Sequence, residues 1–211
     1  MIYIAHRGYG AADNSIESFE NAIKENFNIL ELDLHQTLDN KLVLSHDLFI
    51  GSFNIEETKF QLLRDHYPDL LELKDVFNKF SPNTYSFYLD LKGRDDIANV
   101  LITFVKKNNI NCKNIYVASF NKYHIEILKN SKIDWKVGFI TCNTYLLHEY
   151  DTLLKDIDFV CVDWTSLSYY IVDLLHDSCD TVFAYTCSSQ QEYEYICKYK
   201  IEGIVSDILL K

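Results

Sequence analysis

Short apolar runs alternate with amphipathic stretches of helical spacing along the whole chain. Eight of these runs have the length and composition of β-strands, and they begin near residues 2, 29, 85, 115, 136, 159, 181 and 203. Most of the intervals between them have the apolar spacing of helices. Regular alternation of strand and helix predicts a parallel sheet of the α/β class, and eight repeats favour a closed (β/α)8 TIM barrel.

The pattern also predicts how this barrel is organised. Residues 1–211 form a single domain, with a small, less regular insertion after the second strand that contains one short helix. Few residues follow the last predicted strand, so the last helix is expected to be short or missing. An open doubly wound sheet is the competing fold. No G-x-G-x-x-G follows the first strand, which weakens its dinucleotide-binding version.

Local signals predict two further details near the second strand. The first helix is expected from about Ser15 to Glu25, with Asn14 as its N-cap and Glu17 completing a capping box. The turn signal Asp39-Asn40 separates the second strand from another strand at 42–46. These two strands are therefore expected to form a hairpin-like extension.

Charge and hydropathy exclude several classes of function. The chain carries 20 basic and 31 acidic residues, a net charge of −11, whereas a general nucleic-acid-binding surface needs the opposite sign. Apolar runs are far shorter than the roughly 20 residues of a transmembrane helix, so no stable membrane insertion is expected. The N-terminus does not resemble a signal peptide. We therefore expect a cytoplasmic protein.

Titratable residues gather where several predicted strands end. In a parallel barrel, functional groups lie at the C-terminal ends of the strands, and alternation places residues two apart on the same side of a strand. Because these strands are buried on both faces, charged groups among them need partners or a metal. The residues concerned are His6 and Arg7 after the first strand, Glu31 and Asp33 in the second, His46 after the extension, and Asp90 and Lys92 in the third.

These residue types suit phosphodiester chemistry when they lie together. Two or three carboxylates, here Glu31, Asp33 and Asp90, match the preference of Mg²⁺ or Ca²⁺ for oxygen ligands. Arg7 and Lys92 offer positive charge to a phosphate. Two histidines can act as base and acid near neutral pH. Each residue alone has an ordinary structural explanation, and their joint position at strand ends is what favours a site.

Motifs along nearly the whole chain carry a resemblance to a known family. The most specific is ELDLHQTLDNKLVLSHD at 31–47, with the spacing E-x-D, T-x-D and V-x-x-H-D. The others are AHRG at 5–8, NSIESF at 14–19, LDLK at 89–92, VASF at 117–120 and EGIVSD at 202–207. On these motifs the chain resembles the glycerophosphodiester phosphodiesterase family.

The resemblance implies a role for each matched residue. His6 and His46 would be the acid–base pair, Glu31 and Asp33 metal ligands, and Arg7 and Lys92 phosphate-binding groups. Which histidine is acid and which is base stays open. Two aromatic residues at strand ends, Tyr185 and Trp164, are candidates for lining the substrate pocket, although packing is their more ordinary use.

Three departures from the family pattern bear on the reaction. The family usually has Glu-x-Lys where this chain has Asp90-Leu91-Lys92, which resembles the spider-venom-type phospholipase D branch that favours attack by the substrate's own hydroxyl. The segment Ala12-Asp13-Asn14 replaces the usual Pro-Glu-Asn, a mild change. The insertion is short and the terminal helix is absent, which suggests an open site.

Three functions therefore stay open. The first is metal-dependent hydrolysis of a small-molecule glycerophosphodiester to sn-glycerol 3-phosphate and an alcohol. The second is a lysophospholipase D or cyclising lyase, which an apolar rim formed by Phe49, Ile50 and Phe53 would favour. The third is an inactive barrel used for binding, against which the intact set of His6, Arg7, Glu31, Asp33 and His46 argues.

Overall fold

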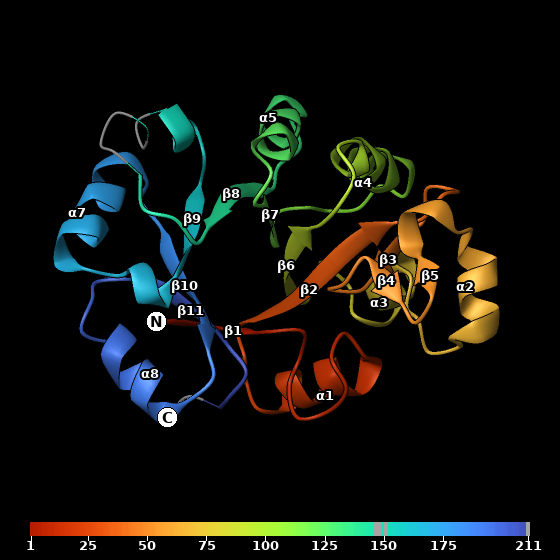
Figure 1. Cartoon of the computed structure of the whole chain (residues 1–211), viewed down its shortest axis with the longest axis horizontal. Coiled ribbons are helices and arrows are strands. Elements are labelled where there is room, and N and C mark those ends of the chain that lie inside the picture. Colours follow the sequence, from red (N-terminus) through yellow and green to blue (C-terminus); the bar gives the residue numbers. More distant parts are fainter. Residues whose placement is uncertain (146–148, 150–151, 210–211) are drawn as a thin grey trace.

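Eight parallel strands close into a barrel in the computed structural model, which describes residues 1–145, 149 and 152–209 (Figure 1). Closure comes from β1, which pairs in parallel with both β2 and β11. The predicted (β/α)8 barrel is therefore confirmed. Its strands are β1 (Ile2–Ala5), β2 (Ile29–Gln36), β6 (Ser86–Leu91), β7 (Ile115–Ser119), β8 (Lys136–Thr141), β9 (Phe159–Asp163), β10 (Val182–Cys187) and β11 (Gly203–Ser206).

Helices surround this barrel (Figure 1). They are α1 (Ile16–Lys24), α3 (Leu73–Lys79), α4 (Ile97–Lys107), α5 (Lys122–Asn130), α7 (Tyr169–Ser178) and α8 (Gln190–Ile196), with a 3-10 turn η2 (Trp164–Ser166). The helix predicted near 145–155 falls partly on residues outside the described part of the chain. Residues 207–209, which follow β11, contain no helix. Among the described residues, every helix is too short or too polar to cross a lipid bilayer.

The start of α1 differs from the prediction. Ser15 is the N-cap: its hydroxyl accepts from the Ser18 N–H, and its own backbone N–H donates to the Ser18 hydroxyl, which completes a capping box. Asn14, the predicted cap, has a left-handed backbone (φ 53°), and its side-chain amide donates to Asp33 on β2 at 3.1 Å. A contact between distant residues has therefore replaced the local capping role that the sequence suggested.

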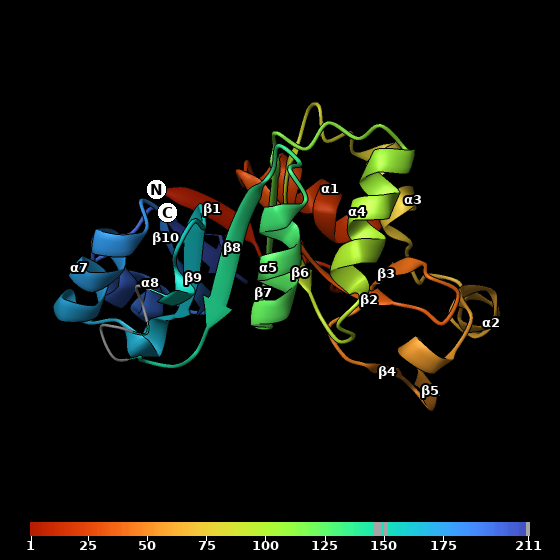
Figure 2. The same ribbon diagram turned by 90° about the horizontal axis from the view of Figure 1, so that it is seen from above.

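The insertion after β2 is more regular than its sequence suggests. β3 (Leu42–Leu44) pairs antiparallel with β2, and it ends two residues before His46, so it is shorter than predicted. A small hairpin of β4 (Phe49–Ile50) and β5 (Phe53–Asn54) follows, then the 3-10 turn η1 (Ile55–Glu57) and α2 (Phe60–His66). Figure 2 shows this unit at the edge of the molecule, beyond β2. It has its own apolar cluster, formed by Val43, Ile55, Phe60, Leu63 and Leu70.

Aromatic side chains fill the interior of the barrel. Phe159 lies 5.5 Å from Tyr88 and 5.3 Å from Phe183 between ring centroids, and Ile4, Ile29 and Val205 pack in the same cluster. A larger core joins the outer face of the barrel to the helices. Tight packing of this kind makes the interior a solid support instead of a channel. The packed interior therefore holds the polar residues at the C-terminal ends of the strands in fixed positions.

Candidate active site

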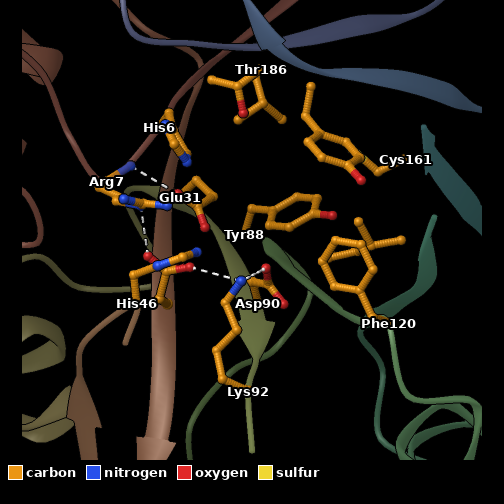
Figure 3. Close-up of a pocket in the computed structure, with 14 residues that line it drawn as sticks. His6, Arg7, Glu31, His46, Tyr88, Asp90, Lys92, Phe120, Cys161 and Thr186 are labelled. Carbon is orange, nitrogen blue, oxygen red and sulfur yellow. Dashed lines mark hydrogen bonds and ion pairs between the residues drawn. The ribbon is translucent and has the colours of Figure 1, made fainter. Parts of the chain in front are cut away.

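Residues from distant parts of the sequence meet around one pocket of about 230 Å³ at the C-terminal ends of the strands (Figure 3). The structure brings eight of the nine predicted site residues to this pocket: His6, Arg7, Glu31, Asp33, His46, Asp90, Lys92 and Tyr185. The ninth, Trp164, lies elsewhere. It begins η2 and its ring packs against Tyr195 of α8, 5.8 Å away between centroids. The expectation that Trp164 lines the pocket is thus corrected, because its side chain faces the helix layer.

Three buried carboxylates form the centre of the site. Glu31 and Asp33 lie on the same side of β2, and the register between β2 and β6 pairs Asp33 with Asp90. One oxygen of each carboxylate lies within 4.8 Å of the others. Their residues are only 3%, 1% and 6% exposed, respectively. Such close, buried negative charges require cationic partners.

Two cationic side chains partly neutralise the cluster. The Lys92 ammonium lies 2.5 Å from Asp90 Oδ2 and 3.2 Å from Asp33 Oδ1. The Arg7 Nε lies 2.9 Å from Asp33 Oδ2, and the Arg7 backbone N–H donates to Glu31 at 2.8 Å. Both cations therefore converge on Asp33, and when all five groups are ionised the cluster keeps a negative charge.

The pKa values follow this uneven distribution. Burial would raise the pKa of Asp33, but Lys92, Arg7 and the Asn14 amide outweigh it and lower that pKa. Burial raises the pKa of Glu31 well above its usual value, and Asp33 and Asp90 raise it further. For Asp90, burial outweighs the effect of Lys92 and raises the pKa to about 6. Lys92 and Arg7 thus do not neutralise all three carboxylates, and the cluster can bind a further cation.

A divalent cation fits this donor set. Asp90 Oδ1 is buried and has no hydrogen-bond partner among the described residues. Glu31, Asp33 and Asp90 offer oxygen ligands only, which suits Mg²⁺ or Ca²⁺ more than softer metals. The orphaned oxygen and the unmet negative charge are together what a hard cation would satisfy. The three carboxylates are therefore the residues that could hold the metal.

A carboxylate fixes His6 on one side of the pocket. Its Nδ1 lies 2.6 Å from Asp207 Oδ1, and the Ser188 hydroxyl donates to the other oxygen of Asp207 at 2.6 Å. Burial would raise the pKa of Asp207, but the bonds from His6 and Ser188 outweigh it and lower that pKa. Asp207 thus stays ionised beside the ring. Nε2 of His6 has no hydrogen-bond partner among the described residues, so it can exchange a proton with a bound molecule.

His46 carries the same kind of contact on the other side. Its Nδ1 lies 2.8 Å from Asp47 Oδ1, and its Nε2 has no hydrogen-bond partner in the described part of the chain. Asp47, however, is 80% exposed and His46 is 47% exposed, so solvent weakens this pair. The two imidazoles are therefore similar in their contacts and different in how firmly their side chains are held.

Apolar and aromatic groups complete the pocket. Phe120, Cys161 and Thr186 lie across the pocket from Arg7 and His46 (Figure 3), and Phe120 packs edge-on against Tyr185 with centroids 6.0 Å apart. Lys92 also lies over the Phe120 ring, 5.6 Å from its centroid. Charge is concentrated on one wall of the pocket and apolar surface on the other.

Sequence reasoning did not assign four residues of this site. Asp207 belongs to the EGIVSD motif, so its position was noted without its partnership with His6. Phe120 likewise closes the VASF motif, and Ser188 gave no signal of its own. Asp47 follows His46 directly and is the last residue of the motif at 31–47. Both carboxylates, Asp207 and Asp47, lie within the motifs, so treating motif residues as partners of the histidines would have found them.

Comparison with known proteins gives a consistent assignment. Residues 6–210 match the model of the glycerophosphoryl diester phosphodiesterase family. A glycerophosphodiester phosphodiesterase from Caldanaerobacter subterraneus subsp. tengcongensis is 23% identical over 236 residues, which cover 98% of this chain and 93% of that protein.

Solved structures share the fold. A glycerophosphodiester phosphodiesterase from Thermotoga maritima is 21% identical with a TM-score of 0.81, over 99% of this chain and 95% of that one. A phosphodiesterase from Oleispira antarctica, solved in complex with the product sn-glycerol-3-phosphate, is 16% identical with a TM-score of 0.82, over 98% of this chain and 93% of that one. At these identities the structures support the barrel fold itself.

Proposed function

The chain belongs to the glycerophosphoryl diester phosphodiesterase family, and on that premise we propose that it hydrolyses glycerophosphodiesters to sn-glycerol 3-phosphate and an alcohol, with His6 and His46 as acid–base pair and Mg²⁺ or Ca²⁺ as cofactor. Membership of the family makes it a phosphodiesterase. The product in the Oleispira antarctica complex, sn-glycerol-3-phosphate, supports the choice of substrate class.

One observation carries the proposal: two imidazoles, each with Nδ1 held by a carboxylate, border a pocket that also holds three buried carboxylates. In hydrolysis, one imidazole accepts the proton of the attacking water while the other donates a proton to the departing alcohol oxygen. Each Nε2 is free for this transfer, and the neighbouring Asp207 or Asp47 stabilises the imidazolium form.

The remaining charged residues act on the phosphate. Arg7 and Lys92 border the same pocket, where their positive charge attracts and orients a phosphodiester anion. A divalent cation held by Glu31, Asp33 and Asp90 would polarise the phosphoryl oxygens and stabilise negative charge on them. Phe120 and Tyr185 form an apolar wall of the same pocket, against which the organic part of the substrate can pack.

A second candidate uses the same site on a lysolipid. The shorter Asp90 and the 56% exposed Phe49, three residues after His46, favour a lysophospholipase D or cyclising lyase. Ile50 and Phe53 contribute less to such a rim, because both pack against the apolar cluster of the insertion. An inactive binding barrel is disfavoured by the complete set of charged residues around the pocket.

Product analysis distinguishes these functions. The metal-loaded protein is incubated with glycerophosphocholine, glycerophosphoethanolamine, lysophosphatidylcholine or bis(p-nitrophenyl) phosphate, with and without EDTA, and products are identified by ³¹P NMR. We expect sn-glycerol 3-phosphate from the first two substrates and loss of turnover with EDTA. A cyclic phosphate would support the lyase instead. Turnover that survives metal removal would contradict the proposed role of the carboxylates.

A further inference from the structure

His46 is exposed and weakly held by its own side chain, so its position depends on its backbone. The Ser45 N–H donates to the Asp33 carbonyl at 3.2 Å, and the Ser45 hydroxyl donates to the Asp47 carbonyl at 2.8 Å. The carbonyl of His46 itself lies 3.2 Å from Nε2 of His35. Since a carbonyl oxygen only accepts, Nε2 of His35 carries a proton and donates it to His46.

His35 is well placed to act as an anchor. It lies on β2 on the same side as Glu31 and Asp33, and it is 3% exposed. Its ring is therefore fixed by the barrel, whereas the residues it contacts belong to the start of the insertion. The hydrogen bond to His46 is partly buried, which reduces competition from water. The bond to His46 thus ties the segment after β3 to the buried strand β2.

The other ring nitrogen of His35 faces the insertion. Nδ1 lies 3.8 Å from Glu56 Oε1, and both atoms are buried without a hydrogen-bond partner among the described residues. Glu56 sits on η1, and its carbonyl accepts from Arg94, which follows β6, at 3.2 Å. Gly93 leaves room for this arrangement, because a β-carbon there would collide with the Glu56 carboxylate.

We propose that His35 is a positioning residue for His46, and that Glu56 couples this position to the insertion. The inference rests on the proposed function, in which His46 transfers a proton to or from the substrate. Proton transfer needs the imidazole within hydrogen-bond reach of a reacting oxygen. His35 restrains the backbone of His46. Asp207 and Ser188 restrain the side chain of His6 in a comparable way.

The test compares four variants with the wild-type enzyme on glycerophosphocholine. His35→Leu removes the donor, whereas His35→Gln keeps an N–H near the position of Nε2. Glu56→Ala removes the link to the insertion. The matched control is His176→Leu, because His176 Nε2 likewise contacts a backbone carbonyl, that of Lys200 at 2.9 Å, and a carboxylate, that of Glu202 at 3.8 Å, away from the pocket.

We expect His35→Leu to lower kcat by about 10–100-fold while KM changes by less than about threefold, because misplacing a catalytic group impairs the transition state more than binding. His35→Gln should recover kcat to within about threefold of wild type, and Glu56→Ala should lose about 3–10-fold. His176→Leu should keep kcat within about twofold of wild type, whatever its melting temperature.

A double variant separates this inference from the proposed function. If His35 acts through His46, His35→Leu combined with His46→Ala should be no slower than His46→Ala alone. A further loss in the double variant would overturn the inference, as would a folded His35→Leu protein of normal kcat or a failure of His35→Gln to recover it. If His35→Leu does not fold, a normal kcat in Glu56→Ala overturns it. Full activity in His46→Ala would instead overturn the proposed function.

Discussion

The two halves of the barrel line the same pocket with different chemistry. Strands β1, β2 and β6, with the segment after β3, supply His6, Arg7, Glu31, Asp33, His46, Asp90 and Lys92. Strands β8 to β11 and the residue after β7 supply Phe120, Ile140, Cys161, Tyr185, Thr186 and Val205. The first half therefore supplies the charged side chains of the pocket, and the second half supplies mostly apolar side chains that determine the shape of the pocket. Substitutions in the first half should affect kcat, and those in the second should affect KM.

The largest expected effect lies in the charged half. His6→Ala and His46→Ala should each lower kcat by about 10²–10⁴-fold, because each removes one proton-transfer group. Steady-state kinetics on glycerophosphocholine measure the loss, and circular dichroism with thermal melting verifies that each variant folds. Near-normal kcat in either folded variant would refute the paired-histidine mechanism.

Acidity should weaken metal binding in the same half. Metal needs ionised carboxylates, whereas burial raises the pKa of Asp90 to about 6 and that of Glu31 well above its usual value. Protons therefore compete with the metal as pH falls through this range. Between pH 7.5 and 5.5, we expect the apparent affinity for Mg²⁺ or Ca²⁺ to fall by about fourfold or more, measured by calorimetry. Asp90→Asn should bind more weakly and depend less on pH. An affinity independent of pH would contradict the buried-cluster description.

The apolar half should show a smaller effect of another kind. Phe120→Ala removes the ring that packs against Tyr185 and borders the pocket. We expect KM for glycerophosphocholine to rise by about 2–10-fold with little change in kcat, as an aromatic contact of this type contributes about 0.5–1.5 kcal/mol. Ile133→Ala, outside the pocket, provides the comparison. A main effect on kcat would break the division between the two halves.

The smallest effect is expected at Trp164. Its ring contacts Tyr195 in the helix layer and does not border the pocket. Trp164→Leu should therefore leave kcat/KM within about twofold of wild type while lowering the melting temperature by a few degrees, since an aromatic packing contact is lost. A large loss of activity without loss of stability would return Trp164 to the substrate site.

Periodicity predicted the barrel because the strands are short, largely apolar runs and each helix has one apolar face, which are local properties of the sequence. It did not predict the β4–β5 hairpin, whose two-residue strands are too short to show a period. The cap of α1 was wrong for a related reason: Asn14 is a good local cap, but its amide is used by Asp33 across the fold.

The candidate site was predicted where residues carry motif spacing and missed where they act through space. Asp207 and His6 are far apart in the sequence, so only the closed barrel brings them together. His35 sits within the most specific motif, yet its contact with the His46 carbonyl depends on how β2 and β3 pair. Trp164 was misjudged because its position after a strand does not fix which way its side chain points.

The closure of the barrel has a consequence for biosynthesis. β1 pairs with β11 along its whole length, and His6 meets a carboxylate 201 positions later. Contacts of such separation form late, since a long loop must close before they stabilise the fold. A chain emerging from the ribosome therefore carries His6 without its partner until residue 207 is outside. We expect the enzyme to gain its activity in one late step, so that incomplete translation products stay inactive.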